Sequence, residues 1–247
     1  MSTSVSATVS AVSKISRVKS ARFYKGSKLV CVAKNYAAHK VEMGGTPERL
    51  PNPAIFLKPS SSVIAPGLPI VIPRAVLDLH HEVELGLVIG GKGDKPCKNI
   101  KAAEWEQYVS GYVLALDMTA RDHQAQAKKD GMPWTLGKCW DTFAPLSSII
   151  PKSSIRDPHD LELFLSVDGV ERQKSNTSKM LHKIPDLLAF ASSVMTLEKG
   201  DVLLTGTPEG VGPVVNGNVI KASLRKPGEK GKLLMEFEFK VVNEHIE

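Results

Sequence analysis

The stretch that most constrains the fold is residues 79–89, Leu-His-His-Glu-Val-Glu-Leu-Gly-Leu-Val-Ile, in which polar and apolar side chains alternate over the first half. A β-strand directs successive side chains to opposite faces of a sheet. One face would then carry the apolar side chains of Val83, Leu85, Leu87 and Ile89. The other face would carry His80, Glu82 and Glu84. The two carboxylates would lie about 7 Å apart along the backbone, at roughly 3.3 Å per residue.

Two carboxylates this close permit two interpretations. Like charges repel unless a cation lies between them, and Asp117, which ends the apolar run 112–116, supplies a third acidic side chain. Three oxygen ligands from two strand ends suit a hard cation such as Mg²⁺ or Mn²⁺. The alternative is a solvated polar face on a half-buried strand. The spacing alone slightly favours this second interpretation.

The positive charge of the chain is concentrated at its start. The formal net charge is +6, yet residues 1–41 contain no Asp or Glu, and the remainder is close to neutral. A high pI of this origin is not the footprint of a nucleic-acid-binding protein. The apolar fraction of 42% is typical of a soluble globular protein, and no stretch reaches the ~20 apolar residues of a membrane helix. We therefore expect neither a nucleic acid nor a membrane as a partner.

Residues 1–25 are expected to precede the folded domain. This segment is basic and rich in Ser, Thr, Val and Ala, without the apolar core of a secretory signal. It could be a mitochondrial presequence, which would direct the protein to the matrix, or a disordered basic tail on a cytosolic protein. The three cysteines lack metal or redox spacing, which indicates reduced thiols in either compartment. No linker follows the tail, so residues 26–247 are predicted to form one domain.

A candidate general base lies in a short predicted helix, residues 36–43, for which Asn35 is the expected N-cap. His39 and Glu42 are three residues apart and would share one face of this helix. A carboxylate that orients an imidazole is a common way to build a general base. An incidental pair on a surface helix would have the same spacing. Residues 44–47, Gly-Gly-Thr-Pro, break the helix and could serve as the hinge of a lid.

Two segments between the candidate acidic site and the second half of the chain also bear on the site. Thr119 to Asp122 reads as a capping box with Asp in place of Glu, and predicts a helix that ends at Gly131. Residues 131–141 are then predicted to be a loop that carries Lys138. A lysine among apolar neighbours can be a functional cation or a surface side chain with a buried stem.

The second half of the chain predicts a hairpin, a helix and a glycine-rich loop. Asp168-Gly169 separates two strand-like runs and is a hairpin turn signal. Apolar residues recur with helical spacing over 184–194, and a short buried strand, 202–205, precedes the loop 206–213. Backbone N–H groups of such a loop can approach an anion. A tight structural turn would have the same composition.

Six motifs follow one another along the chain, and their order is more informative than any one of them. They are Asn35-Tyr36-x-x-His39-x-x-Glu42, Phe56-Leu57-Lys58-Pro59, His81-Glu82-Val83-Glu84-Leu85, Leu116-Asp117-Met118-Thr119-Ala120-Arg121-Asp122, Lys138, and Leu204-Thr205-Gly206-Thr207-Pro208. In this order they resemble the fumarylacetoacetate hydrolase superfamily, and most closely its small single-domain branch of mitochondrial acylpyruvases and oxaloacetate decarboxylases. The resemblance spans roughly residues 27–242.

The resemblance implies a fold and a metal ion. The fold would be of the α+β class and rich in strands, with a rolled mixed β-sheet, a few flanking helices and usually a homodimeric assembly. A Mg²⁺ or Mn²⁺ ion would be held by Glu82, Glu84 and Asp117, which reverses the preference for a solvated face. The basic start of the chain fits the mitochondrial presequence of this branch.

The resemblance also implies roles for individual side chains. His39 and Glu42 would form the catalytic pair on a mobile lid, and Lys138 would stabilise negative charge. The implied substrate-binding residues are Lys34, Arg121, Thr205, Gly206 and Thr207. Lys34 stands where many relatives have Arg, and a lysine cannot grip a carboxylate through two parallel hydrogen bonds.

The implied substrate is a 2-oxo acid, which can chelate one metal ion through a carboxylate and a keto oxygen. We expect hydrolysis of acylpyruvates to pyruvate and a carboxylic acid, with oxaloacetate decarboxylation, both through a metal-bound enolate. The alternatives are an oxaloacetate keto–enol tautomerase, a family isomerase or hydratase, and a non-catalytic dicarboxylate-binding protein. A zinc hydrolase is disfavoured because the chain has no H-E-x-x-H helix.

Overall fold

The computed structural model describes residues 24–90, 97–228 and 231–244, and the basic tail expected at 1–25 lies almost wholly outside them. A six-stranded sheet in the order β10-β7-β6-β13-β1-β2 carries the acidic stretch. It is mixed, because β1 and β13 pair in parallel whereas the other neighbours are antiparallel. Its strands are β1 (Lys28–Ala33), β2 (Ala54–Pro59), β6 (Val83–Ile89), β7 (Val109–Leu116), β10 (Ile150–Pro151) and β13 (Val202–Leu204).

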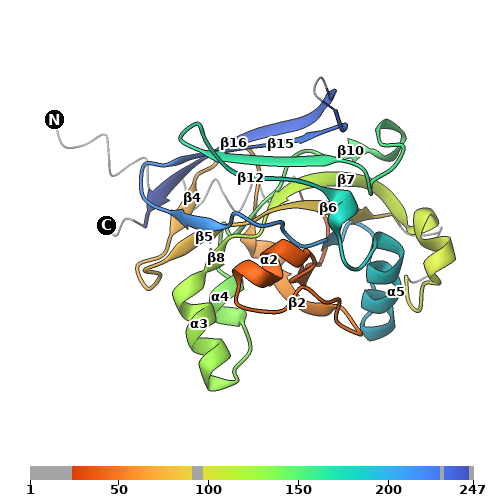
Figure 1. Ribbon diagram of the computed structural model, residues 1–247, viewed down its shortest axis with the longest axis horizontal. Coiled ribbons are helices and arrows are strands. Elements are labelled where there is room, and N and C mark those ends of the chain that lie inside the picture. Colours follow the sequence, from red (N-terminus) through yellow and green to blue (C-terminus); the bar gives the residue numbers. More distant parts are fainter. Residues whose placement is uncertain (1–23, 91–96, 229–230, 245–247) are drawn as a thin grey trace.

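A five-stranded sheet in the order β12-β11-β15-β16-β4 packs on the first, and forms the upper layer in Figure 1. Its strands are β4 (Ile70–Ile72), β11 (Glu162–Val167), β12 (Val170–Asn176), β15 (Val219–Arg225) and β16 (Leu233–Asn243). Leu85 and Leu87 of β6 lie in one core cluster with Leu163 and Leu165 of β11. The apolar face predicted for residues 83–89 therefore packs on the second sheet.

Smaller sheets complete the strand-rich fold, in the orders β14-β5-β8 and β3-β9. Their strands are β3 (Val63–Ile64), β5 (Leu79–His81), β8 (Thr119–Ala120), β9 (Ala144–Pro145) and β14 (Gly212–Val214). The acidic stretch was predicted as one strand, but it is divided at Glu82, because β5 leaves the first sheet to pair with β14 and β8. The expected α+β class with a mixed sheet is confirmed.

The α-helices in the described ranges are short, from 4 to 11 residues. The α-helices are α2 (Ala37–Glu42), α3 (Arg121–Asp130), α4 (Thr135–Lys138) and α5 (Ile184–Val194). The 3₁₀ helices are Ser60–Ser62, Ala102–Tyr108, Lys152–Ser154 and Thr177–Lys179. In Figure 1, α2, α3 and α4 lie on the side of β6 and β7 opposite the second sheet. Within the described ranges, no helix is long and apolar enough to cross a membrane.

Several local predictions agree with the structure. The turn between β11 and β12 consists of Asp168 and Gly169, with φ of 51° and 80°, as a two-residue hairpin turn requires. Helix α5 occupies the predicted range, with Pro185 in its first turn. Helix α3 ends at Gly131, whose φ of 66° gives a left-handed C-terminal cap.

Two predicted helix caps were wrong. The N-cap of α2 is Tyr36, without a side-chain cap, and Asn35 instead reaches distant backbone groups. The N-cap of α3 is Ala120, and the Thr119 hydroxyl bonds to the carbonyl oxygen of Asp117 at 3.0 Å. Asn35 is thus taken by tertiary contacts, and Thr119 by a local backbone carbonyl group, although both side chains favour helix caps in isolation.

The predicted loop 131–141 was also partly wrong, because it contains the short helix α4. This helix buries Lys138, whose residue exposure is 2%. Trp140 donates its indole N–H to the carbonyl oxygen of Leu136 at 2.6 Å, which holds the end of the turn. The segment therefore delivers Lys138 inward, and the interpretation of this lysine as a surface side chain is wrong.

Candidate active site

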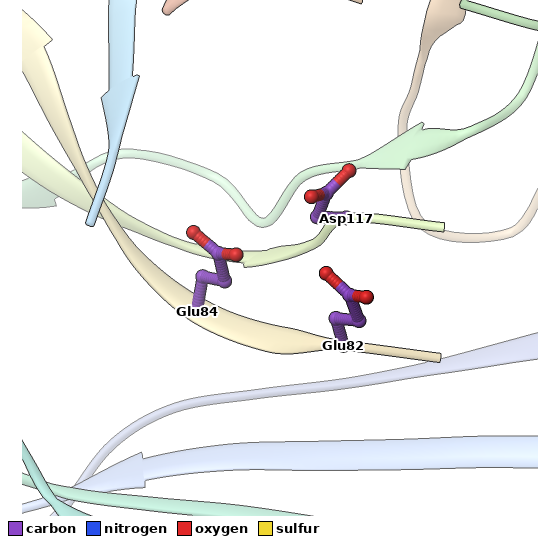
Figure 2. Close-up of side chains that lie close together, drawn as sticks. All are labelled: Glu82, Glu84 and Asp117. Atoms are coloured by element: carbon purple, nitrogen blue, oxygen red, sulfur yellow. The ribbon is translucent and has the colours of Figure 1, made fainter. Parts of the chain in front are cut away.

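Three carboxylates converge between β6 and β7. Glu82, Glu84 and Asp117 each offer an oxygen atom within 4.8 Å of the others, and Figure 2 shows their side chains projecting to the same side of the strands. Their residue exposures are 5%, 1% and 1%. The solvated polar face that spacing alone favoured is therefore wrong. These side chains form a buried acidic cluster.

The register of β6 and β7 explains the convergence. The strands are antiparallel, with Val83 opposite Leu116, so the residue just before β6 lies beside the residue just after β7. The backbone N–H of Asp117 donates to the carbonyl oxygen of Glu82 at 2.8 Å. Glu84 is two residues further along β6 and shares the face of Glu82.

Two cations compensate the charge of Glu82. The ammonium group of Lys138 lies 3.0 Å from Glu82 Oε2, 2.6 Å from Asp117 Oδ2 and 2.6 Å from the hydroxyl of Thr119. Arg121, the first residue of α3, donates to Glu82 Oε1 at 2.6 Å. Burial opposes ionisation of Glu82, but Lys138 and Arg121 outweigh it and hold its pKa well below the usual value. Burial also opposes the charge of Lys138, yet Asp117 and Glu82 raise its pKa.

Glu84 has the opposite electrostatic environment. Burial, followed by the nearby charges of Asp117 and Glu82, raises its pKa well above the usual value. Its Oε2 accepts the backbone N–H of Gly206 at 2.7 Å. The raised pKa of Glu84 means that the surrounding side chains do not supply enough positive charge to keep all three carboxyl groups ionised. A bound cation would supply the missing positive charge.

Lys58, which belongs to the motif Phe56–Pro59 but was given no role from the sequence, is also part of the site. It belongs to β2 and is 0% exposed, and its ammonium group lies 2.9 Å from Asp117 Oδ1. The same group donates to the carbonyl oxygens of Met118, Lys138 and Phe143 at 2.8, 2.6 and 3.0 Å. The apolar neighbours of Lys58 in β2 gave no sign of this, because all four acceptors are distant in sequence.

The donor set fits a hard divalent cation. All three ligands are carboxylates, which Mg²⁺ and Mn²⁺ prefer over soft metals. Asp117 Oδ1 is buried without a hydrogen bond of acceptable geometry, although Lys58 lies within ion-pair distance. A buried oxygen in this state has unused capacity for a ligand bond. Glu82, Glu84 and Asp117 are therefore the residues that would hold the ion.

The predicted His39–Glu42 pair is formed. His39 Nδ1 lies 3.0 Å from Glu42 Oε2, and because the carboxylate can only accept, Nδ1 carries the proton and Nε2 is left for chemistry. The other oxygen, Glu42 Oε1, accepts the backbone N–H of Gly210 at 3.0 Å. Gly210 has a φ of 90°, and a Cβ atom there would lie 2.0 Å from the carbonyl oxygen of Arg172. Glu42 thus orients His39 and also joins α2 to the glycine-rich loop.

The segment that carries α2 is fixed at both ends to one residue. The Asn35 amide donates to the carbonyl oxygens of His182 and Thr205 at 3.0 and 2.8 Å and accepts the His182 backbone N–H at 2.7 Å. At the far end, Arg49 Nε donates to His182 Nδ1 at 3.0 Å. Both ends of the segment are thus attached to His182. We refer to residues 36–48, which lie between these attachments and carry His39, as the lid.

The glycine-rich segment faces the metal-ligand strand with its polar groups. Thr205 Oγ1 donates to the carbonyl oxygen of Leu85 at 2.9 Å, and Thr207 Oγ1 donates to that of Val83 at 2.8 Å. Between them, Gly206 has a φ of 92°, and a Cβ atom there would lie 2.7 Å from the Asn35 Cβ. The two threonine hydroxyls therefore stabilise β6, a role that the sequence did not predict. The backbone N–H of Gly206 approaches an anion, as glycine-rich loops can, but this anion is the Glu84 carboxyl group of the protein itself.

A second residue missed by sequence reasoning, Gln173 of β12, braces these elements. It is 0% exposed, and its Oε1 accepts the backbone N–H of Val83 at 3.0 Å and contacts His81 Nδ1 at 3.0 Å. Its Nε2 donates to Thr207 Oγ1 at 2.9 Å and to the Pro208 carbonyl oxygen at 3.0 Å. One amide thus connects the hairpin, the ligand strand and the glycine-rich loop.

The carboxylates face a cavity whose remaining space for a water-sized sphere is about 20 Å³. That is room for about one water molecule or ion, so side chains must move before a substrate enters. The predicted residues that line the cavity are Lys34, His39, Glu82, Glu84, Asp117, Arg121, Lys138 and Thr207. Glu42, Thr205 and Gly206 are not part of this lining and act on it through their neighbours.

Comparison with known proteins gives consistent results. A family model described as fumarylacetoacetate (FAA) hydrolase C-terminal matches residues 28–240. The mitochondrial oxaloacetate tautomerase FAHD1 of Arabidopsis thaliana is 52% identical over 202 residues, which cover 82% of this chain and 88% of that protein. The mitochondrial oxaloacetate decarboxylase of Dictyostelium discoideum is 51% identical over 200 residues, with coverages of 81% and 89%.

The fold comparison agrees with the sequence comparison. A fumarylpyruvate hydrolase from Pseudomonas aeruginosa, solved in complex with Mn²⁺ and pyruvate, superposes with a TM-score of 0.79 at 34% identity. The superposition covers 90% of this chain and 91% of that one.

Proposed function

The chain belongs to the fumarylacetoacetate hydrolase family, and from this premise we propose that it is a Mg²⁺- or Mn²⁺-dependent enzyme that acts on oxaloacetate as a keto–enol tautomerase with decarboxylase activity. The observation that carries the proposal is the convergence of three buried carboxylates, two cations and a His–Glu pair around one cavity. The names of two relatives above 50% identity support oxaloacetate as the substrate.

The metal ion, held by Glu82, Glu84 and Asp117, would act as a Lewis acid on the C2 carbonyl of the 2-oxo acid. Arg121 keeps Glu82 ionised and oriented through the 2.6 Å hydrogen bond. Gly206 orients the Glu84 carboxyl group with its backbone N–H, although burial and the neighbouring carboxylates still raise the pKa of Glu84. These contacts fix the direction of the ligand oxygens before the ion binds, which limits the reorganisation that binding requires.

Tautomerisation moves one proton between C3 and the C2 oxygen of oxaloacetate. His39 lines the cavity, and its Nε2 is the atom that would take the proton from C3 or return it. Glu42 holds the imidazole in the required tautomer and stabilises the imidazolium that forms. Lys138 is protonated and buried beside the cluster, and would donate a hydrogen bond to the C2 oxygen as negative charge develops there.

Decarboxylation of keto-oxaloacetate uses the same electron flow. The C3–C4 bond breaks and CO₂ leaves, its bonding pair forms the C2–C3 double bond, and the carbonyl pair moves onto the C2 oxygen. A proton taken from solvent by His39 Nε2 is then passed to C3 as the carbonyl re-forms. No water molecule is consumed. The two reactions therefore differ only in which group leaves C3, a proton or CO₂.

The proposal is tested by assaying keto-oxaloacetate, enol-oxaloacetate and acetylpyruvate side by side with Mg²⁺. We expect the keto–enol reaction to be fastest, to disappear with EDTA and to return with Mn²⁺. Glu84→Gln should lose the activity, and the exposed charge-matched control Glu171→Gln should keep it. Tautomerisation at the uncatalysed rate, or activity indifferent to EDTA, would refute the proposal.

Acylpyruvate hydrolysis is the second candidate. It is supported by the fumarylpyruvate hydrolase that superposes on this chain with Mn²⁺ and pyruvate bound. In this reaction the His39–Glu42 pair would take a proton from a water molecule that attacks the distal carbonyl carbon. A larger kcat/KM for acetylpyruvate than for either form of oxaloacetate would make this the principal activity.

We also propose that residues 1–25 are a presequence, that residues 26–247 form the single catalytic domain, and that this domain works as a homodimer in the mitochondrial matrix. The mitochondrial relatives support the compartment. Fusion of residues 1–25 to a fluorescent protein tests the targeting, and light scattering of residues 26–247 tests the dimer. A cytosolic fusion protein, or a monomer at micromolar concentration, would contradict the respective statement.

A further inference from the structure

Two cations that line the cavity have no ion pair with a carboxylate within the described residues. Lys34 is half-buried and Lys128 is exposed, whereas the three carboxylates are buried, so we refer to the side of the two lysines as the mouth of the cavity. Lys34 directly follows β1, and Lys128 lies in the third turn of α3. Both line the cavity that contains the three carboxylates. The other lining cations, Arg121 and Lys138, are instead ion-paired with Glu82.

Lys128 belongs to the face of α3 that is directed to the cavity. Arg121, Gln124 and Lys128 are spaced at i, i+3 and i+7, which places them on one side of a helix, and all three line the cavity. Lys128 is about 10 Å further along the helix axis than Arg121. Helical side chains lean toward the N-terminus, so Lys128 leans back toward the carboxylates. Its ammonium group lies 5.5 Å from the ring centroid of Trp134.

Lys34 is held in an uncommon backbone conformation. Its φ of 57° is in the left-handed region, which costs a residue with a Cβ atom energy and is maintained only by its surroundings. The next residue, Asn35, is fixed by its three hydrogen bonds to His182 and Thr205. The backbone thus holds Lys34 at the mouth of the cavity.

Charge balance separates the cavity into an inner and an outer part. In the inner part, a divalent ion, Lys138, Arg121 and the buried Lys58 would oppose three carboxylates. Two positive charges are then left, which one substrate carboxylate and the charge that develops on the C2 oxygen would match. The outer part adds the charges of Lys34 and Lys128, with no acidic group among the lining residues to neutralise them. Burial, followed by the charges of Lys34 and Arg121, lowers the pKa of Lys128. An anion between the two lysines would relieve this repulsion.

We infer that Lys34 and Lys128 form a subsite for the second carboxylate of a four-carbon 2-oxo dicarboxylate, so that the protein selects dianionic over monoanionic 2-oxo acids. The inference rests on the proposed function and extends it from a reaction to a rule for substrate choice. Lys128 was not among the residues expected from the sequence. Two separate lysines suit this task, because each donates to one oxygen without the parallel geometry of a guanidinium group.

The subsite also affects which group leaves C3. Decarboxylation converts the C4 carboxylate into neutral CO₂, so an ionic interaction with that carboxylate is lost as the C3–C4 bond breaks. An interaction stronger in the ground state than in the transition state slows the step. Proton transfer at C3 leaves the C4 charge unchanged and does not incur this loss. The lysine pair therefore favours tautomerisation over decarboxylation.

The test compares Lys34→Met and Lys128→Met with the control Lys129→Met in the Mn²⁺-loaded protein. Lys129 is the next residue of α3 and is exposed, and it does not line the cavity. Binding of oxaloacetate and of 2-oxobutyrate, which lacks the C4 carboxylate, is followed by tryptophan fluorescence. We expect each cavity variant to bind oxaloacetate about tenfold more weakly, to bind 2-oxobutyrate as the wild type does, and to form more pyruvate per tautomerisation event.

Two results would overturn the inference. Equal weakening of both ligands would mean that the lysines shape the pocket without recognising charge, and behaviour like that of Lys129→Met would mean that they do not contact the ligand. A wild type that prefers oxaloacetate to 2-oxobutyrate in binding, yet turns over neither tautomer, would support the subsite and refute the proposed function.

Discussion

The carboxylate cluster and the lid are built in opposite ways. Glu82, Glu84 and Asp117 are at most 5% exposed and are held by strands, backbone N–H groups and buried cations. The lid carries the six-residue helix α2, in which Val41 is 54% exposed. Within the described residues, the side chain that joins this helix to the opposite loop is Glu42. The three carboxylates are thus preorganised, and we propose that the lid, which carries His39 as the base, opens to admit the substrate.

This difference separates two functions that one site must combine. A rigid cluster keeps three like charges together, and a movable lid admits a substrate to a cavity with little free space. Damage to the cluster should therefore affect metal binding and catalysis together. Damage to the lid should affect catalysis alone.

The largest effect is expected from Asp117→Asn. The change keeps the shape but removes a ligand charge and the ion-pair partner of Lys58 and Lys138. We expect kcat/KM to fall at least about 10³-fold, because a bound metal ion contributes several kcal/mol to transition-state stabilisation. Mn²⁺ titration followed by electron paramagnetic resonance should show weak binding. Retained Mn²⁺ affinity in a folded variant would show that Asp117 is not a ligand.

The next effect is expected from His39→Ala on the lid. Loss of a general base typically costs about 10²–10⁴-fold in rate, while the cluster keeps its ligands, so Mn²⁺ affinity should stay within about twofold of the wild type. Val41→Ala, on the exposed side of the same helix, is the matched control. If His39→Ala weakened Mn²⁺ binding as much as it weakened turnover, the separation of cluster and lid would fail.

A smaller effect is expected from Gln173→Leu, which removes the brace between the ligand strand and the glycine-rich loop. Hydrogen bonds that orient metal ligands without touching the ion typically account for about 10–100-fold in metal affinity or activity. We expect both Mn²⁺ affinity and kcat/KM to fall by a factor within this range. Ser175→Ala is the control, because Ser175 lies two residues along the same strand and its buried hydroxyl has no hydrogen-bond partner among the described residues. Equal losses in the two variants would reduce Gln173 to a packing residue.

The smallest effect on the active site is expected from Asp201→Asn. Asp201 directly precedes β13 and bonds to the start of β1, at the end of this strand pair that is remote from Thr205 and Lys34. Burial opposes ionisation of Asp201, but hydrogen bonds from Lys28, the Glu198 backbone and Ser27 lower its pKa. A depressed carboxyl pKa stabilises the fold above the unfolded value of about 3.9, and this stabilisation is lost as the pH falls through the folded value.

The variant should therefore lose about 1–3 kcal/mol of unfolding free energy at pH 7, and this difference should narrow below about pH 4. Urea denaturation at pH 7 and pH 3 measures it. Turnover at pH 7 should stay unchanged, and a drop in kcat would mean that the two ends of the strand pair are coupled.

Sequence patterns predicted the turns and helices that depend on residues close together in the chain. The turn Asp168-Gly169 and helix 184–194 follow from residues that are neighbours in the chain. The convergence of Glu82, Glu84 and Asp117 was implied by the resemblance to a known family, whereas strand alternation by itself gave only the shared face of Glu82 and Glu84. Local rules of this kind need no knowledge of distant partners.

The misses share a different cause. Asn35 was expected to cap a helix, but its partners are His182 and Thr205, more than a hundred residues away in the chain. Lys58 donates to the backbone carbonyl groups of Met118, Lys138 and Phe143, and Gln173 accepts the backbone N–H of Val83. A side chain with only distant partners leaves no periodic signal, so these residues could be placed only from the fold.

The complete enclosure of Lys58 has a practical consequence. Its ammonium group is sealed beneath the carboxylates, whereas Lys34 and Lys128 face the cavity mouth. An acylating reagent added to the native protein should modify the mouth lysines and spare Lys58, which would react only after denaturation. The rate at which Lys58 becomes acylated would thus report how often the core opens, on a timescale that turnover assays do not reach.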